Sequence, residues 1–104
     1  MRSNIIASGS YIPSLKVTND DLATVMDTSD EWITQRTGIK TRYYETLSNA
    51  HMAIEAARHT QFDMETIDCI VVCTYTADEA IPTLANQVKK GLGISRDIPC
   101  FDVN

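Results

Sequence analysis

The sequence predicts an α/β fold in which helices pack against a mainly parallel sheet. Residues 69–73, CIVVC, are apolar without alternation, which is typical of a strand covered on both faces of such a sheet. An amphipathic stretch at 81–93 follows, and a second apolar segment, IPCFDV, comes soon after it. A strand, a helix and another strand in this order indicate a βαβ unit with a right-handed crossover.

The start of the chain predicts one strand and one helix. NIIASGSYI at 4–12 is apolar and Pro13 ends it, so we expect a short strand there. A helix is expected over 18–26, with Thr18 or Asn19 as its cap. Its apolar residues at i, i+3 and i+4 are expected to face inward, and these are Leu22, Val25 and Met26.

A second short helix is predicted between Thr28 and Gly38. Thr28 and Glu31 have the S/T-x-x-E spacing of a capping box, and Gly38 suits the left-handed residue that ends a helix. Positions 28, 32 and 36 step by four residues. Thr28, Trp32 and Arg36 are therefore expected to form a stripe along one side of this helix.

The stripe has two interpretations. An exposed indole beside a guanidinium could stack on a flat base and hold a nucleotide, with Thr28 adding a hydroxyl contact. Alternatively, Trp32 packs in the core while Arg36 forms a surface ion pair with Asp30 or Glu31. Spacing alone favours the second interpretation and does not decide between the two.

Two further helices complete the predicted elements. TLSNAHMAIEAARHT, residues 46–60, carries small and apolar residues at helical spacing, which suits close packing. His51 and His59 on this helix are expected to be surface or partly buried residues. In the helix at 81–93, Pro82 fits the first turn and Gly93 the stop, while the buried face holds Ile81, Leu84, Ala85, Val88 and Leu92.

Composition excludes several classes of function. The 104 residues suit one globular unit or part of one, and a net charge of −5 without a basic run argues against nucleic-acid binding. No apolar stretch is long enough for a membrane span or a signal peptide, so a cytoplasmic protein is expected. The three cysteines form no CxxC pair, which predicts buried thiols, no disulfide and no metal site.

Five segments together identify a family. GSYIP, VTNDDL, DTSDEWITQRTGIKTR, TADEAIPTLANQVKKGLG and FDVN occur in the order found at the start of β-ketoacyl-acyl-carrier-protein synthase III. The resemblance covers essentially the whole chain, and its long middle motif is highly specific. It implies a thiolase-like layered fold, of which residues 1–104 would be the incomplete first half, ending just before the catalytic cysteine.

The resemblance implies an acyltransferase that condenses an acyl-CoA primer with malonyl-acyl-carrier protein to initiate fatty acid synthesis. CoA is then a substrate, and no cofactor is expected. In the family, the tryptophan and arginine of the middle motif sandwich the adenine of CoA and its threonine lies nearby, which assigns Trp32, Arg36 and Thr28. The family's catalytic cysteine, histidine and asparagine match no residue of this chain, so these 104 residues alone are expected to be inactive.

The resemblance also implies a homodimer. The loop matching ADEAIP reaches across the family's interface, where Ile81 would help to wall the partner's acyl pocket or, alternatively, act as ordinary interface packing. Docking of an acidic carrier protein would need a basic patch, for which Lys40 with Arg42 is a small candidate.

Two alternatives to a condensing enzyme remain at this point. The chain could be a non-catalytic module that binds CoA or pairs with another subunit, or a truncation product whose uncovered sheet promotes association.

Overall fold

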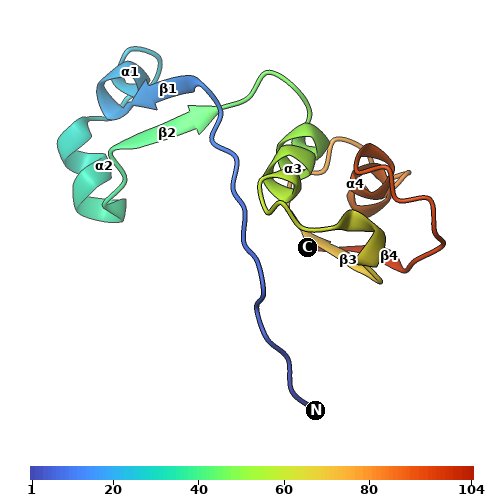
Figure 1. Ribbon diagram of the computed structural model, residues 1–104. Coiled ribbons are helices and arrows are strands. Elements are labelled where there is room, and N and C mark those ends of the chain that lie inside the picture. The colour runs from blue at the N-terminus through green and yellow to red at the C-terminus, as the bar shows by residue number, and fades with distance from the viewer. The chain divides into compact units, whose positions relative to one another are not determined.

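A computed structural model describes residues 1–104, which divide into two compact units rather than the single unit expected from the length. The smaller unit is Ile12–Thr46, and the larger combines Met1–Tyr11 with Leu47–Asn104. Each unit holds two strands, and Figure 1 labels the helices and strands of both.

The smaller unit is a strand pair joined through two helices. Strand β1 (Leu15–Thr18) pairs antiparallel with β2 (Thr41–Tyr44), and Thr18 lies opposite Thr41. Between them run the helices α1 (Asn19–Ala23) and α2 (Asp30–Thr37). This strand pair was not expected from the sequence, because four-residue strands that mix apolar and polar residues give little periodic signal.

Helix α1 begins as expected and ends early. The Thr18 hydroxyl accepts the Asp21 backbone N–H, and the Asp21 carboxylate accepts the Thr18 N–H, which completes a capping box. The helix stops at Ala23, and Val25 and Met26 beyond it are 77% and 55% exposed. The expectation that these two side chains face inward was wrong, because they lie past the end of the helix.

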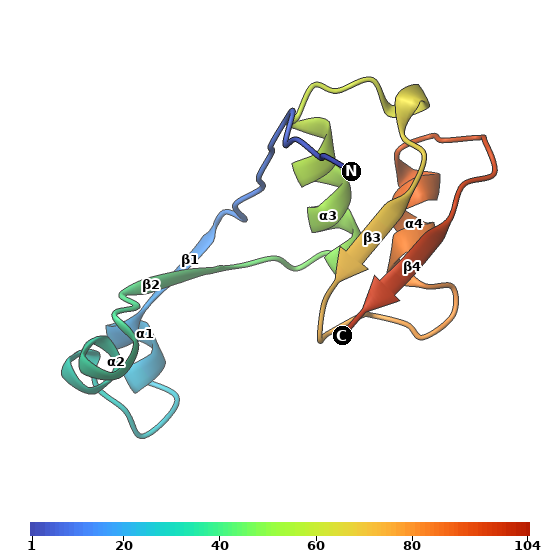
Figure 2. The same ribbon diagram turned by 90° about the horizontal axis from the view of Figure 1, so that it is seen from below.

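The larger unit contains the predicted βαβ arrangement. Strands β3 (Ile70–Cys73) and β4 (Cys100–Val103) are parallel, and helix α4 (Leu84–Gly91) connects them and packs against both. Helix α3 (Asn49–Arg58) packs on α4, and a short 3₁₀ helix η1 (Met64–Thr66) precedes β3. Figures 1 and 2 show α3 and α4 on the same side of the β3–β4 sheet.

The core of the larger unit lies between α4 and one face of the sheet. Leu84, Ala85 and Val88 of α4 are buried, as predicted, while Leu92 is half-buried and Ile81 lies outside the helix. The opposite face of the sheet is exposed at Val71, Phe101 and Val103. The expectation that both faces of β3 are covered was therefore wrong, since α4 covers one face of the sheet and Val71 of β3 is exposed on the other.

Two other expectations fail in the larger unit. Residues 4–12 form no strand, because no neighbouring strand supplies the hydrogen bonds that a strand requires. The side chains of Ile5 and Ile6 in this segment are exposed. Cys69 and Cys73 are exposed and Cys100 is half-buried, instead of all three being buried. All three thiols are free, as expected. The two histidines also agree with the expectation, since His51 is half-buried and His59 is exposed.

Gly91 allows α3 and α4 to approach closely. A methyl group at Gly91 would lie 2.1 Å from Ile54 Cδ1 and 2.8 Å from its Cγ1. Gly91→Ala is therefore expected to destabilise the protein by about 1–2 kcal/mol, the cost of overpacking reduced by alanine's better helix propensity. In an Ile54→Ala background, which removes these atoms, the same substitution should be neutral or stabilising. Equal denaturant midpoint shifts in both backgrounds would contradict the close packing.

Candidate functional site

Trp32 and Arg36 form an exposed pair on helix α2. The Arg36 guanidinium carbon lies 5.2 Å from the centroid of the indole ring, within the range of a cation–π contact. Trp32 is 54% exposed, and the ion pairs of the structure join Arg58 to Glu55 and Arg96 to Asp68. The interpretation of Trp32 as a core residue with Arg36 in an ion pair was therefore wrong.

Helix α2 is capped at both ends, although its first cap differs from the prediction. The Ser29 hydroxyl, and not that of Thr28, accepts a backbone N–H, which comes from Trp32 at 3.1 Å. Gly38 ends the helix with φ 72° and donates its N–H to the Thr34 carbonyl, as the sequence predicted. The caps fix the turn from which Trp32 projects.

Thr28 lies outside the helix and does not continue the stripe. It precedes the cap residue, and its hydroxyl oxygen is buried without a hydrogen-bond partner. A contact between this hydroxyl and a ligand would require the side chain to turn outward. The structure thus brings Trp32 and Arg36 together, and it leaves the Thr28 hydroxyl buried before the start of the helix.

Asn19 holds the helix that carries the pair, and sequence reasoning considered it only as a possible cap. Its side chain is 2% exposed and its amide nitrogen donates to Asp30 Oδ1 at 2.8 Å and the Ile39 carbonyl at 2.9 Å. A longer contact of 3.3 Å reaches the Thr34 hydroxyl. Asn19 therefore connects α1 to both ends of α2, because Asp30 begins that helix and Ile39 follows its end.

The carboxyl group of Asp30 is held in its charged form. Its hydrogen bond from Asn19, and then that from Thr34, lower the pKa of Asp30 below the ordinary value of 3.8. The pKa of Asp21 is likewise lowered, by its hydrogen bonds from Thr18. Both carboxylates belong to the smaller unit and hold the elements around the pair.

Ile81 belongs to the larger unit, in the loop between β3 and α4. The side chain is 87% exposed, so it is available to a second molecule. Asn49 fixes the start of this loop: its amide donates to the Thr74 hydroxyl and the Thr76 carbonyl, and its N–H to Asp78 Oδ2.

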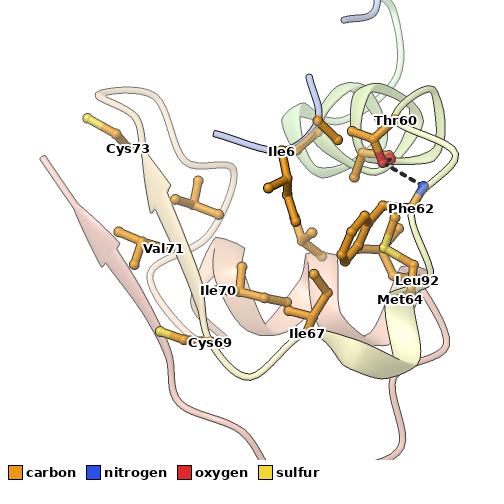
Figure 3. Close-up of a pocket in the computed structure, with 15 residues that line it drawn as sticks. Ile6, Thr60, Phe62, Met64, Ile67, Cys69, Ile70, Val71, Cys73 and Leu92 are labelled. Atoms are coloured by element: carbon orange, nitrogen blue, oxygen red, sulfur yellow. Dashed lines mark hydrogen bonds between the residues drawn. The ribbon is translucent and has the colours of Figure 1, made fainter. Parts of the chain in front are cut away.

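An apolar cavity of about 560 Å³ lies in the larger unit (Figure 3). Ile6, Ile70 and Leu92 are among the residues that line it, and Phe62 donates its N–H to the Thr60 hydroxyl at its edge. No lysine, arginine or carboxylate lines this cavity. It lacks the groups that would recognise a phosphate, so the Trp32–Arg36 pair remains the better candidate for a nucleotide site.

Other kinds of site receive no support from the geometry. No group of three or more histidine, cysteine or carboxylate side chains is placed to hold a metal ion. None of the helices has the length and apolar character that crossing a membrane demands.

Comparison with known proteins places these features in context. The chain is 46% identical over 107 aligned residues to β-ketoacyl-[acyl-carrier-protein] synthase III of Neisseria gonorrhoeae, and 42% identical over 109 to that of Neorickettsia sennetsu. These alignments cover 97% and 99% of the chain but 33% and 35% of the relatives. The chain thus spans about a third of the length of the relatives it matches. No family model matches it.

Solved structures agree with the sequence comparison. The crystal structure of 3-oxoacyl-[acyl-carrier-protein] synthase III from Aquifex aeolicus matches with a TM-score of 0.85 and 36% identity, over 94% of this chain and 33% of that one. The synthase III structure from Thermus thermophilus matches with a TM-score of 0.84 and 34% identity, over 97% of this chain and 33% of that one. The predicted α/β fold of the thiolase-like class is confirmed.

Proposed function

Because this chain corresponds to the N-terminal part of β-ketoacyl-[acyl-carrier-protein] synthase III, we propose that it forms the CoA-binding portion of a condensing enzyme. The complete enzyme would join an acyl-CoA primer to malonyl-acyl-carrier protein in the cytoplasm and so begin fatty acid synthesis. The observation that carries the assignment of CoA to this chain is the exposed Trp32–Arg36 pair, with 5.2 Å between guanidinium and indole.

The pair suits the adenine end of CoA. An indole face offers a flat apolar surface to a purine, and a guanidinium can lie over the purine or pair with a phosphate. Adenine would enter between the ring and Arg36, which have to separate slightly to admit it. Because the chain carries a net charge of −5, long-range attraction does not draw the anionic ligand, and these local contacts must provide the recognition.

The condensation itself would use residues outside this chain. We propose that a cysteine follows Asn104 within a few residues and attacks the primer thioester, releasing free CoA and retaining the acyl group. Loss of CO₂ from the malonyl group would then supply the carbanion that takes the acyl group and frees the thiol. None of the chain's three cysteines is suited to this role, because a nucleophilic cysteine is activated at the start of a helix. Cys69 precedes a strand, and Cys73 and Cys100 lie within strands.

An assay of the complete enzyme tests this function. The gene that encodes the chain, extended to its full reading frame, should yield a protein that converts acyl-CoA and malonyl-acyl-carrier protein into β-ketoacyl-carrier protein and CO₂. Mass spectrometry of the carrier protein measures the product. Residues 1–104 alone should give none, and absence of product from the complete protein with short, long and branched primers would contradict the proposal.

A second candidate function is a non-catalytic fragment that pairs with another subunit. The exposed side chains of Val71, Phe101 and Val103 favour it, because an apolar sheet face of this kind is normally covered. Analytical ultracentrifugation of residues 1–104 distinguishes it, since a stable, defined complex with a separately encoded relative would support pairing.

Ile81 is proposed to set the primer preference in a homodimer of the complete enzyme. Ile81→Phe should narrow the partner's acyl pocket and lower the ratio of kcat/KM for branched over straight primers by about tenfold or more. Steady-state kinetics with matched primers measures this ratio. If Ile81 only packs between subunits, the substitution will change dimer dissociation in ultracentrifugation and leave the ratio unchanged.

A further inference from the structure

Asp102 joins the end of strand β4 to the first turn of helix α4. Its carboxylate oxygens accept the backbone N–H groups of Leu84 and Ala85, each at 2.8 Å. Leu84 and Ala85 are 1% and 0% exposed, so water cannot replace the carboxylate as their partner. A carboxylate at a helix N-terminus also interacts favourably with the helix dipole.

Two different side chains cap this helix. The Thr83 hydroxyl, from the residue directly before the helix, accepts the N–H of Asn86 at 3.3 Å. Asp102 accepts the two preceding N–H groups and belongs to another element of the fold. Thr83 therefore stabilises α4 locally, whereas Asp102 also fixes where the end of β4 lies relative to that helix.

Asp102 lies at the edge of the sheet where the carboxyl ends of β3 and β4 and the loop that carries Ile81 come together. The carboxyl ends of parallel strands lie together, and the Thr74 N–H that follows β3 donates to the carbonyl of Val103. The loop that carries Ile81 starts at this edge and enters α4 at Thr83. Asp102 thus links the residues that precede Asn104 to the end of that loop.

We propose that Asp102 is a positioning residue for the condensation reaction. This inference rests on the proposed function, in which the nucleophilic cysteine follows Asn104. By holding the end of β4 against α4, the carboxylate fixes the direction in which the chain leaves the strand, and with it the position of the thiol relative to the bound primer.

The test compares Asp102→Asn with Thr83→Ala in the complete enzyme. The asparagine has the same shape but turns an N–H₂ group toward one of the two backbone donors, so the link loosens. We expect kcat to fall by about ten- to a hundredfold while the KM for the acyl-CoA primer changes less than about threefold. Thr83→Ala removes the other cap of the same helix and should leave kcat within about twofold.

Thermal midpoints and thiol reactivity complete the test. Both variants should lower the midpoint, Asp102→Asn by more because it leaves a buried N–H without an acceptor. Asp102→Asn alone should slow alkylation of the proposed nucleophile by iodoacetamide, measured peptide by peptide. If the two variants reduce kcat and alkylation equally, Asp102 is only a helix cap and the proposal fails. Activity of the unsubstituted enzyme is measured first, so an inactive enzyme counts against the proposed function and is not confused with the failure of Asp102's role.

Discussion

Replacing Trp32 with alanine is expected to weaken CoA binding by about ten- to a hundredfold, because stacking of a base on an aromatic ring contributes about 1–3 kcal/mol. Arg36→Ala should weaken it less, by about three- to thirtyfold, since the cation–π and phosphate contacts are partly solvated. Equilibrium dialysis with labelled CoA measures both affinities without depending on the fluorescence of the indole that is removed.

Gln35→Ala provides the matched control for these substitutions. Gln35 is exposed on the same helix and takes no part in the cation–π contact between Arg36 and Trp32, so its removal should leave CoA affinity unchanged. Circular dichroism of all three variants checks that α2 persists. Equal affinities for the Trp32 and Gln35 variants would contradict a role for the indole in binding.

Asn19→Ala should cause the largest loss of stability in the smaller unit, about 2–4 kcal/mol. The substitution removes the donor that the Ile39 carbonyl and the Asp30 carboxylate share, and it opens a space where the buried amide was. Trp32 is the sole tryptophan and lies in the same unit, so its emission during denaturant unfolding reports this loss directly. Thr24→Ala, at an exposed position whose hydroxyl donates to the Asp21 carbonyl within α1, should have a smaller effect.

The same variant should change the pH dependence of stability. A carboxyl group whose pKa is lower in the folded than in the unfolded protein stabilises the fold above its ordinary pKa of 3.8 and loses that contribution as the pH falls through the folded pKa. Asn19→Ala removes the largest cause of the lowered pKa of Asp30, so the loss of stability below about pH 4 should become smaller. An unchanged acid limb, with the Asp21 capping box intact, would contradict this assignment.

Local signals in the sequence predicted the candidate site only in part. The four-residue step between Trp32 and Arg36 and the stop at Gly38 are consequences of helix geometry, and both appear in the structure. The cap lies at Ser29 instead of Thr28, since two adjacent hydroxyl residues offer nearly equivalent caps. Asn19 could not be found in this way, because its partners at 30, 34 and 39 are set by tertiary packing.

In the fold, too, elements defined by local sequence patterns were predicted, and features that depend on residues far apart in the chain were not. The βαβ unit follows from hydrophobic patterning over adjacent segments, and the structure confirms it. The strand expected over residues 4–12 depends on a partner strand elsewhere in space, and no strand of the structure pairs with this segment. Asp102 carries no periodic signal, because its partners Leu84 and Ala85 lie 18 and 17 residues earlier in the chain.

Titration of the chain with CoA, followed by the fluorescence of Trp32, examines the nucleotide site itself. Pantetheine, which lacks adenine and the nucleotide phosphates, serves as the comparison ligand. We predict that CoA quenches the emission saturably, with weak affinity in residues 1–104, and that pantetheine at the same concentration leaves it unchanged. An emission that responds to neither ligand up to about 10 mM, or to both alike, would contradict the binding of adenine by Trp32 and Arg36.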